Sequence, residues 1–543
     1  MFCNQCGSPL EEGTLFCANC GAKQDVAEAP ATTPVATEQT AVPVAAEPVV
    51  SEEAAQPKKK FDLMANKKLL MFGGAGIVVV LLVVLLFMLI GGGSSVKYDK
   101  YADVMVSYFN SRGEGYLFNT NGEITELDST VYDGYGSADQ SAAVFSIRED
   151  GVQVLYYADA EMDPKFVEED VYEYYISYDG SHIAYIQDMN AEWTGGDLYL
   201  YSVEDDKAVK IDSDVYPYEI VMSPNGEYIA YWKNYEGYSD NDLVLGSYSK
   251  DSEKIDKDGS YPVGITNDGK LYYITDNGKL YYHNGKEAVK IASDMDGTCY
   301  FNNDLTELLY TKSGKTYYFT PKMKEALKIS GDYTYDILAP ENMIYEYYGE
   351  AYVLGRESLK NSVWETYDGL MWFNENGKEM SKITSYYGDC QISEDGETLI
   401  FTRDGVLFKV DDFTGKSKPE ALYNDDYIDG IVANGDLSKI YVVIDDELYY
   451  VKNAKKSERI TNDLEDGTYS VVYSDSLGKV VFIEDETLCY ADTSEKSKKE
   501  IEEEVYDVES SYGVVIYTIY DEDTFSYTYY LLTGDKSVEL YTY

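Results

Sequence analysis

The chain has 543 residues, with 98 acidic side chains against 44 lysines and arginines, and its formal charge at neutral pH is −54. Because nucleic-acid binding depends on lysines and arginines that neutralise phosphates, this charge disfavours a nucleic acid as partner. Hydrophobic residues make up 44% of the chain, which excludes disorder throughout, and the length exceeds one ordinary globular core. The composition therefore predicts folded regions whose partners are not nucleic acids.

Residues 1–24 contain four of the seven cysteines, Cys3, Cys6, Cys17 and Cys20, in two C-x-x-C-G units. Two such thiolate pairs complete a closed tetrahedral shell around one Zn²⁺ and leave no position for water or substrate. A redox or disulfide pair is the competing interpretation, which a cytoplasmic location disfavours. The pattern resembles the short zinc-ribbon family at the amino end of many bacterial membrane proteins. It predicts one structural zinc ion per chain and a cytoplasmic protein as the partner of the ribbon.

Residues 25–68 are rich in Ala, Pro and Glu and end in lysines, a composition that predicts a disordered tether with a basic end. Leu69 to Ile90 then form an uncharged apolar run of 22 residues, long enough as a helix to cross a hydrocarbon core of roughly 30 Å. The alternative, a buried core helix, rarely contains so long an uncharged aliphatic run. We therefore expect a transmembrane helix at residues 69–90, followed by a short linker at 91–97.

The flanks of this helix predict its orientation. Lys58, Lys59, Lys60, Lys67 and Lys68 precede it, whereas the segment directly after it contains two lysines beside two aspartates. The positive-inside rule then places the amino terminus in the cytoplasm and residues 94–543 outside the cell membrane. These external residues carry a net charge of −51, since residues 1–93 contain only six lysines and nine acids.

Residues 98–543 repeat a short polar turn followed by an apolar strand, as in "SYDGSHIAYI", "SPNGEYIAYW", "TNDGKLYYI" and "SEDGETLIFT". The Asp-Gly and Asn-Gly pairs supply the positive φ of tight hairpins. A second piece, typified by "GDLYLYS" and "DELYYVK", recurs every 36 to 54 residues, anchored at Leu198, Leu243, Leu280, Thr316, Leu370, Leu407, Leu448 and Leu488. A spacing near 40 residues with about four short strands per unit is typical of β-propeller blades.

The segment "SPNGEYIAYW" resembles the repeats of propellers associated with TolB and with dipeptidyl peptidases and prolyl oligopeptidases. This resemblance spans most of residues 98–543 and implies a fold, not an activity. About eight blade-like repeats are clear, and degenerate units at 115–119, 152–157 and 527–532 raise the total to ten or eleven. Because propellers usually have four to eight blades, the alternatives are incomplete units or two tandem propellers.

Signals for catalysis are few. The repeats run to Tyr543, no G-x-S-x-G nucleophile elbow occurs, and both histidines, His182 and His283, lie in or beside strands, where a structural role is expected. Acidic turns near Asp256 and Asp294 have ligands for Ca²⁺ but do not match the EF-hand loop. Cys299, Cys390 and Cys489 are predicted to be buried and unpaired, because Cys299 and Cys390 occupy equivalent positions in separated blades.

All 57 tyrosines follow residue 97, and most of them alternate or pair within the strand motifs. We expect the majority to pack between blades and a minority to remain at the propeller faces, where rings stack on sugars or peptide side chains. The preferred interpretation is a mainly β, single-pass membrane protein. Its external propeller binds, scaffolds or senses an envelope protein or glycan, without catalysis. The alternative is an external enzyme, a hydrolase or lyase that acts on glycan or peptide.

Overall fold

The computed structural model describes residues 59–61, 105–107, 115–119, 123–127 and, with short gaps, 131–542. The chain divides into Met1–Pro57 and Lys58–Tyr543, and every described residue belongs to the second unit. These residues form strands, turns and two short 3₁₀ helices, η3 (Gly467–Ser470) and η4 (Glu495–Ser497), with no α-helix among them. The prediction of a mainly β fold is confirmed for this part of the chain.

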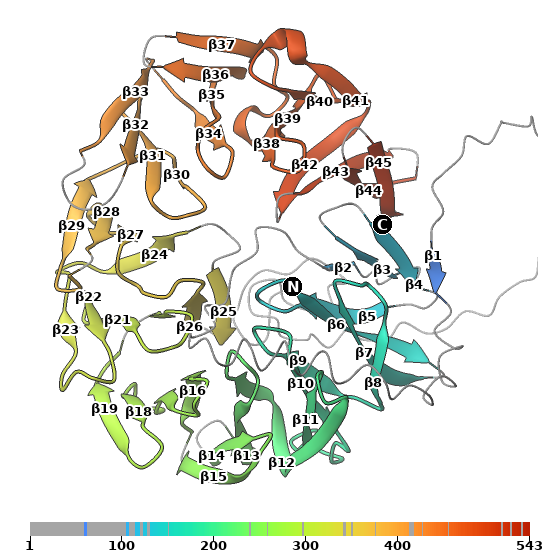
Figure 1. Cartoon of the computed structure of the whole chain (residues 1–543), viewed down its shortest axis with the longest axis vertical. Coiled ribbons are helices and arrows are strands. Elements are labelled where there is room, and N and C mark those ends of the chain that lie inside the picture. The colour runs from blue at the N-terminus through green and yellow to red at the C-terminus, as the bar shows by residue number, and fades with distance from the viewer. Residues whose placement is uncertain are drawn as a thin grey trace, which may run out of the picture. The chain divides into compact units, whose positions relative to one another are not determined.

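The described strands form ten sheets, and Figure 1 shows them following one another around a ring. Eight of the ten are four-stranded blades. The first combines β1 (Lys59–Phe61), β4 (Ile124–Leu127), β3 (Gly115–Phe118) and β2 (Met105–Ser107), and the second has β5 (Val131–Gly136), β6 (Ala142–Glu149), β7 (Val152–Asp159) and β8 (Lys165–Glu169). β1 pairs with β4 in parallel, and it lies within the residues predicted as a tether.

A seven-stranded sheet follows, in which two units share one long strand. Its order is β9 (Glu173–Ile176), β10 (His182–Gln187), β11 (Gly196–Ser202), β12 (Lys207–Met222), β13 (Tyr228–Gly237), β14 (Asp240–Ser247) and β15 (Lys250–Lys257). The first part of β12 pairs with β11 and its last residues pair with β13, with register shifts between. β12 is therefore the outer strand of one unit and the inner strand of the next.

Two further sheets lead to an inserted hairpin. One has β16 (Tyr261–Ile265), β17 (Leu271–Ile274), β18 (Leu280–His283) and β19 (Ala288–Ala292), and the other has β20 (Cys299–Phe301), β21 (Leu308–Lys312), β22 (Lys315–Phe319) and β23 (Leu327–Lys328). The hairpin of β25 (Ile344–Tyr348) and β26 (Ala351–Leu354) joins the second sheet, because β26 pairs in parallel with the innermost strand β20. Figure 1 shows this hairpin toward the centre of the ring.

The remaining blades are regular four-stranded sheets. They are β24 (Thr334–Leu338) with β27 (Ser362–Thr366), β28 (Gly369–Phe373) and β29 (Met380–Thr384); β30 (Cys390–Ile392), β31 (Thr398–Arg403), β32 (Val406–Asp411) and β33 (Glu420–Asn424); β34 (Gly430–Ala433), β35 (Ile440–Ile444), β36 (Glu447–Asn453) and β37 (Lys456–Thr461); β38 (Val471–Ser474), β39 (Lys479–Glu484), β40 (Thr487–Ala491) and β41 (Lys499–Glu502); and β42 (Val505–Ser511), β43 (Val514–Asp521), β44 (Ser526–Thr533) and β45 (Lys536–Thr542).

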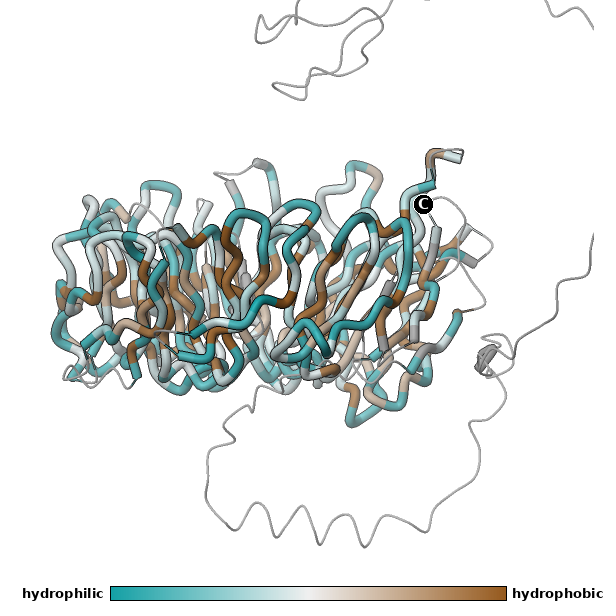
Figure 2. Tube along the Cα trace, turned by 90° about the horizontal axis from the view of Figure 1, so that it is seen from above, coloured by the Kyte–Doolittle hydropathy of each residue, from teal (hydrophilic) through white to brown (hydrophobic). Residues whose placement is uncertain are grey.

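Burial changes across each blade in the order of its strands. Second strands such as β31 and β39 are buried through their middle, whereas fourth strands such as β19 and β41 are mostly exposed. A second strand is apolar on both faces because a blade packs against each of its sides. In the edge-on view of Figure 2, the hydrophobic segments accordingly lie in the middle of the disc and hydrophilic loops lie at its two faces.

The predicted repeat anchors all occupy third strands. Leu198, Leu243, Leu280, Leu370 and Leu488 are fully buried, as is Thr316. Segments predicted as outer strands, such as "EAVKIASD" and "SERITNDL", form β19 and β37. Each of the eight clear repeats forms a blade-like unit, the three degenerate units lie in four-stranded sheets as well, and all of them share one ring instead of two tandem propellers.

The ring closes through side-chain packing. Phe118 of β3 packs with Val514, Leu531 and Leu540 of the last blade in one buried cluster. Leu117 and Leu127 of the first blade pack on the other side against Val131 and Phe145 of the second. Among the described strands, no sheet combines strands from the first and the last blade, so the closure depends on these apolar contacts.

The turn between first and second strands is held by the same side-chain bonds in several blades. In the turn after β30, the Ser393 hydroxyl donates to Asp395 at 2.5 Å and accepts from the Thr398 amide at 2.9 Å. Gly396 has the positive φ, 69°, that the hairpin requires. Ser177 with Asp179 and Ser223 with Asn225 repeat this bond in the seven-stranded sheet.

We predict that Ser393→Ala lowers the free energy of unfolding by about 1–2 kcal/mol, because Ser393 is 2% exposed and the change removes both of its bonds. Urea unfolding monitored by tyrosine fluorescence measures the change. Ser249→Ala, at an exposed turn position, is the control and should be neutral. Equal stability of the two variants would contradict the role assigned to this turn.

Candidate functional site

The predicted metal site and membrane segment lie outside the described residues. Cys3, Cys6, Cys17 and Cys20, and the run from Leu69 to Ile90, fall in ranges whose structure is not described. Within the described residues, no helix is long and apolar enough to cross a membrane, and no three His, Cys, Asp or Glu side chains gather as a metal site. Asp256, predicted beside a candidate Ca²⁺ turn, accepts a hydrogen bond from the Ser260 hydroxyl at 2.9 Å.

The two histidines lie in strands and are 7% exposed each. His182 packs its ring against Tyr248, with 5.5 Å between centroids, and its Nδ1 lies 3.0 Å from the Ser181 hydroxyl. Burial lowers the pKa of His182, so the neutral ring is favoured. The Nδ1 of His283 is buried without a hydrogen-bond partner among the described residues. Both positions agree with the predicted structural role.

The three external cysteines are not joined in disulfides. Cys299 and Cys489 are buried as predicted, but Cys390 is only half-buried, which corrects that part of the prediction. Cys299 and Cys390 occupy equivalent ends of β20 and β30, yet only β20 is covered, because β26 pairs with it at Cys299. The inserted hairpin explains the difference in exposure.

Two sets of loops meet on one face of the ring. Because strands within a blade are antiparallel, the loops into each first strand and the turns between second and third strands share one face. The Tyr386 hydroxyl, before β30, donates to Asp404 of the β31–β32 turn at 2.5 Å. The ring of Tyr172, before β9, packs on Trp193 of the β10–β11 turn, with 5.1 Å between centroids.

This face, which we call the tyrosine face, contains most of the exposed aromatic residues. Of the fourteen exposed large hydrophobic residues among the described residues, ten are aromatic residues on this face, and each of the ten is at least 49% exposed. Those at the start of first strands or just before them are Tyr132, Tyr218, Tyr335, Tyr386, Tyr427, Tyr469 and Tyr506, and those in turns between second and third strands are Trp193, Tyr367 and Phe525. Apart from these, Val152 follows such a turn on this face, and Tyr135, Phe166 and Val289 lie on inner or outer strands.

An acid directly follows the tyrosine in several of these first strands. The pairs are Tyr132-Asp133, Tyr172-Glu173, Tyr218-Glu219, Tyr335-Asp336 and Tyr506-Asp507. Asp133, Asp336 and Asp507 each accept a hydrogen bond from the next backbone amide, at 2.7–2.9 Å, which fixes the carboxylate at the strand start. The recurrence of "VYD", "VYE", "PYE" and "TYD" is the sequence signal that locates this feature, and the sequence analysis missed it.

Two of these acids have raised pKa values. Burial raises the pKa of Glu219 to about 7, and its Oε2 is buried without a hydrogen-bond partner among the described residues. Burial also raises the pKa of Glu173, and the nearby Asp133 carboxylate adds to the increase. The tyrosine face therefore contains carboxyl groups that resist ionisation where neighbouring first strands come close.

Charge is distributed unequally between the two faces. The loops that lead from one blade into the next first strand contain no lysine or arginine, and the turns between second and third strands contain only Lys279. The turns between third and fourth strands, on the opposite face, contain lysines in most blades, including Lys286, Lys322, Lys324, Lys378 and Lys496. The tyrosine face is thus acidic with few cations of its own.

Other tyrosines connect blades within the ring. The Tyr175 hydroxyl donates to the Pro217 carbonyl at 2.7 Å, and the Tyr300 hydroxyl donates to the Tyr335 carbonyl at 2.9 Å. Tyr135 donates in the same way to the carbonyl of Tyr174. Each bond joins the first strand of one blade to the start of the next first strand. Tyr231, Tyr272, Tyr441 and Tyr517 are fully buried. The predicted division into packed and face tyrosines is confirmed.

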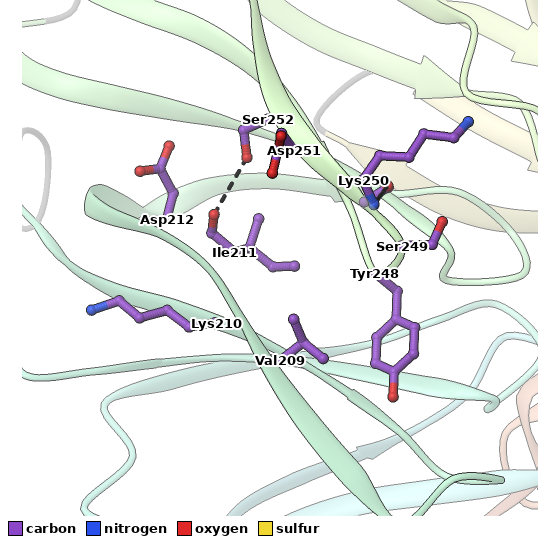
Figure 3. Close-up of a pocket in the computed structure, with 10 residues that line it drawn as sticks. Val209, Lys210, Ile211, Asp212, Tyr248, Ser249, Lys250, Asp251 and Ser252 are labelled. Carbon is purple, nitrogen blue, oxygen red and sulfur yellow. Dashed lines mark hydrogen bonds between the residues drawn. The ribbon is translucent and has the colours of Figure 1, made fainter.

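A cleft of about 750 Å³ lies at the outer edge of the seven-stranded sheet, between β12 and β15 (Figure 3). Its polar groups bond to one another and to the sheet: Asp212 accepts from the Tyr231 hydroxyl at 2.8 Å and from Lys233, and the Ser252 hydroxyl donates to the Ile211 carbonyl at 3.4 Å. Burial raises the pKa of Asp212, but the hydrogen bonds from Lys233, the Ser213 amide and Tyr231 together with the Lys233 charge outweigh burial, and the pKa is lowered. The polar groups of this cleft therefore form hydrogen bonds that hold the sheet together, and they show no catalytic arrangement.

Comparison with known proteins finds distant structural similarity and no family. No family model matches the chain, and no curated protein matches it. Among solved structures, TolB from Acinetobacter baumannii is 12% identical with a TM-score of 0.25, over 42% of this chain and 61% of that one. The β-propeller domain of the Trilobed protease from Pyrococcus furiosus is 12% identical, with a TM-score of 0.28, over 61% and 97%. Dipeptidyl peptidase 4 of Porphyromonas gingivalis is 14% identical, with a TM-score of 0.31, over 75% and 58%.

The match thus spans less than two thirds of the TolB chain and of the dipeptidyl peptidase. The strand topology by itself defines the fold class, a β-propeller. These comparisons do not distinguish binding from catalysis.

We predict that Glu219→Gln stabilises the protein above neutral pH. The pKa of Glu219 is raised in the folded state, so its contribution is full below the unfolded pKa of about 4.5 and is lost as the pH rises through about 7. At pH 8 the variant should gain about 1 kcal/mol in free energy of unfolding, a figure reduced for the partial exposure of the side chain. Urea unfolding at pH 4.5 and pH 8 measures the difference.

The exposed Glu204, in the turn before β12, supplies the control for this comparison. Glu204→Gln should show no comparable gain between the two pH values. A gain for Glu219→Gln that is as large at pH 4.5 as at pH 8 would contradict the assignment.

Proposed function

We propose that this protein is a single-pass membrane protein whose external propeller binds an envelope protein or glycan through the tyrosine face. The observation that carries the proposal is the concentration of exposed aromatic residues on that face. Exposed tyrosines and tryptophans supply large contact areas at small entropic cost, and their hydroxyl and indole groups remain able to form hydrogen bonds. A ring of such residues suits recognition of an extended surface.

Binding without turnover fits the described residues better than hydrolysis. Catalysis by a propeller face requires a pocket in which a few acids or histidines converge. On the tyrosine face, Asp133, Asp336 and Asp507 bond to their own backbones, and both histidines are buried in strands away from it. The acids recur from blade to blade around the ring, which spreads the charge instead of concentrating it.

The remaining parts of the proposal rest on the sequence. The run from Leu69 to Ile90 anchors the chain in the cell membrane, with the amino terminus in the cytoplasm. Cys3, Cys6, Cys17 and Cys20 hold one structural Zn²⁺, and the ribbon contacts a cytoplasmic protein. The protein then connects recognition outside the membrane to a protein contact inside it.

The proposed binding is tested by capture from envelope extracts. Full-length protein in a nonionic detergent, immobilised through its amino terminus, should retain a protein or peptidoglycan fragment. The variant Tyr218→Ala/Tyr335→Ala/Tyr506→Ala should lose at least four fifths of the captured material. Phe166→Ala, at an exposed aromatic on outer strand β8, is the control and should capture normally. Equal capture by both variants, or turnover of a captured glycan or peptide, would exclude the binding role of this face.

Topology and zinc are tested together by cysteine labelling. In intact cells an impermeant maleimide should leave Cys3, Cys6, Cys17 and Cys20 unmodified. After permeabilisation these thiolates should react only when a zinc chelator is added, because metal-bound thiolates are protected. A cysteine introduced at Ser95 should react in intact cells. Peptide mass spectrometry identifies the modified positions, and labelling of Cys3 in intact cells would reverse the proposed orientation.

The same experiment decides the place of Lys59–Phe61. A single membrane crossing at residues 69–90 puts this segment on the cytoplasmic side, whereas its pairing with β4 as β1 puts it beside the external propeller. The two arrangements exclude one another. We expect that a cysteine introduced at Lys60 is protected in intact cells and reacts after permeabilisation, and that modification in intact cells would favour the β1 pairing.

A further inference from the structure

We propose that the ligand of the tyrosine face is a polypeptide segment rich in lysine and arginine, bound in extended contact with the tyrosine rings and the acids beside them. This inference rests on the proposed binding function and names its partner class. Three features of the described residues support it: the exposure of the rings, the excess of acids, and contacts between cations and tyrosines within the chain.

The rings are placed where a cation can reach their faces or edges. Tyr132, Tyr335 and Tyr506 are 53%, 51% and 61% exposed, and each precedes an acid in the chain. A cation over a tyrosine ring gains from the negative ring face, and the acid next in the chain adds negative potential at the strand start. These strand starts thus combine an exposed ring with negative charge, and both attract a lysine or arginine.

The chain already forms such a contact on this face. The guanidinium of Arg148, at the end of β6, lies 5.5 Å from the centroid of the Tyr132 ring. Elsewhere Lys479 lies 4.0 Å from the Tyr490 centroid, and Lys250 lies 5.2 Å from that of Tyr228. These internal pairs show that tyrosine rings of this chain contact both guanidinium and ammonium groups. Most face tyrosines follow loops that contain no lysine or arginine to fill this role.

The exposed acids of the tyrosine face disfavour other classes of ligand. Asp336, Asp445 and Asp485 are exposed on the tyrosine face, and the loops that surround them repel phosphates and anionic lipid headgroups. A neutral glycan would stack on the rings but would leave these negative charges unneutralised. A second copy of the chain is disfavoured by its own net charge of −54. A cationic polypeptide uses both the rings and the charges, so it fits the surface best.

The blade architecture supports an extended ligand. Tyrosine and acid pairs recur at the starts of β5, β24 and β42 and in the last part of β12, which is the first strand of the next unit, and Tyr172 with Glu173 stands directly before and at the start of β9. The hydroxyls of Tyr172 and Tyr218 lie 2.5 Å apart, so face tyrosines of neighbouring units reach one another. Contacts repeated from unit to unit favour a chain with cations at several positions over a single small cation.

The test uses a fluorescent 16-residue peptide of alternating lysine and glycine and full-length protein in a nonionic detergent. The matched probe is the same peptide with every lysine acetylated, which removes the charge and retains the length. Fluorescence anisotropy should show binding of the first peptide that weakens with salt, and at least tenfold weaker binding of the acetylated one. Tyr218→Ala/Tyr335→Ala/Tyr506→Ala should weaken binding at least fivefold, whereas Phe166→Ala should leave it unchanged.

Two charge variants separate the tyrosine face from net charge. Asp336→Asn/Asp445→Asn/Asp485→Asn removes three charges from this face, and Glu204→Gln/Glu325→Gln/Glu495→Gln removes three exposed charges from turns on the opposite face. The first should weaken binding at least threefold more than the second. Equal effects would show attraction by net charge alone and overturn the proposal, as would unchanged binding in the tyrosine variant.

The remaining outcomes distinguish this inference from the proposed function. Envelope capture that depends on the face tyrosines, without binding of the lysine peptide, overturns the cationic ligand and retains the binding function. Face-dependent binding to phosphatidylcholine vesicles containing one fifth phosphatidylglycerol, without peptide binding, assigns the face to a membrane and overturns the inference. Loss of both envelope capture and peptide binding overturns both proposals.

Discussion

The side-chain bond that closes the turn between the first and second strands of a blade is the constraint on which the ring depends. In six of these turns among the described residues a serine, threonine or asparagine bonds to an acid or amide two residues later, as Ser137 does to Asp139 at 2.7 Å and Thr266 to Asp268 at 2.5 Å. The fixed turn then presents its amide to the next blade: Asp139 donates to the Tyr178 carbonyl at 3.1 Å and Glu394 to the Gly435 carbonyl at 2.8 Å. A local turn thus becomes a connection between blades.

Tyrosine contributes to both the stability and the surface of the same ring. On first strands, Tyr135, Tyr175 and Tyr300 use their hydroxyls to bond to the next blade, with their rings partly or fully buried. At the starts of β5 and β24, Tyr132 and Tyr335 instead project with about half of their surface exposed. The position of a tyrosine within a first strand therefore decides whether it bonds to the next blade or remains on the face. This explains why so many tyrosines are compatible with a folded, highly acidic domain.

The sequence predicted the blades because their period is carried by buried residues. The buried residues Leu198, Leu280 and Leu448 recur in third strands. Their side chains are fully buried there, and burial requires an apolar residue. The hairpin of β25 and β26 has no counterpart in other units, so no period marked it, and its pairing with β20 depends on tertiary contacts. The concentration of exposed tyrosines on one face was not predicted, because first strands are short and variable, although the repeated tyrosine-acid pairs that precede or begin them were visible. The zinc ligands and the membrane helix remain predictions.

The position of the face residues at strand starts lowers the entropic cost of binding a ligand. Tyr335 and Tyr506 each lie at a register shift between two residues that pair with the neighbouring strand, and Asp336 and Asp507 are each held by the following amide. Ordering a flexible loop on binding would cost about 1–2 kcal/mol per residue in backbone entropy, and groups at strand starts avoid most of this cost. A ligand with several weak cation contacts can therefore reach useful affinity on this surface. The ordering cost falls mainly on the ligand, which favours an extended cationic segment over a ligand that must itself fold.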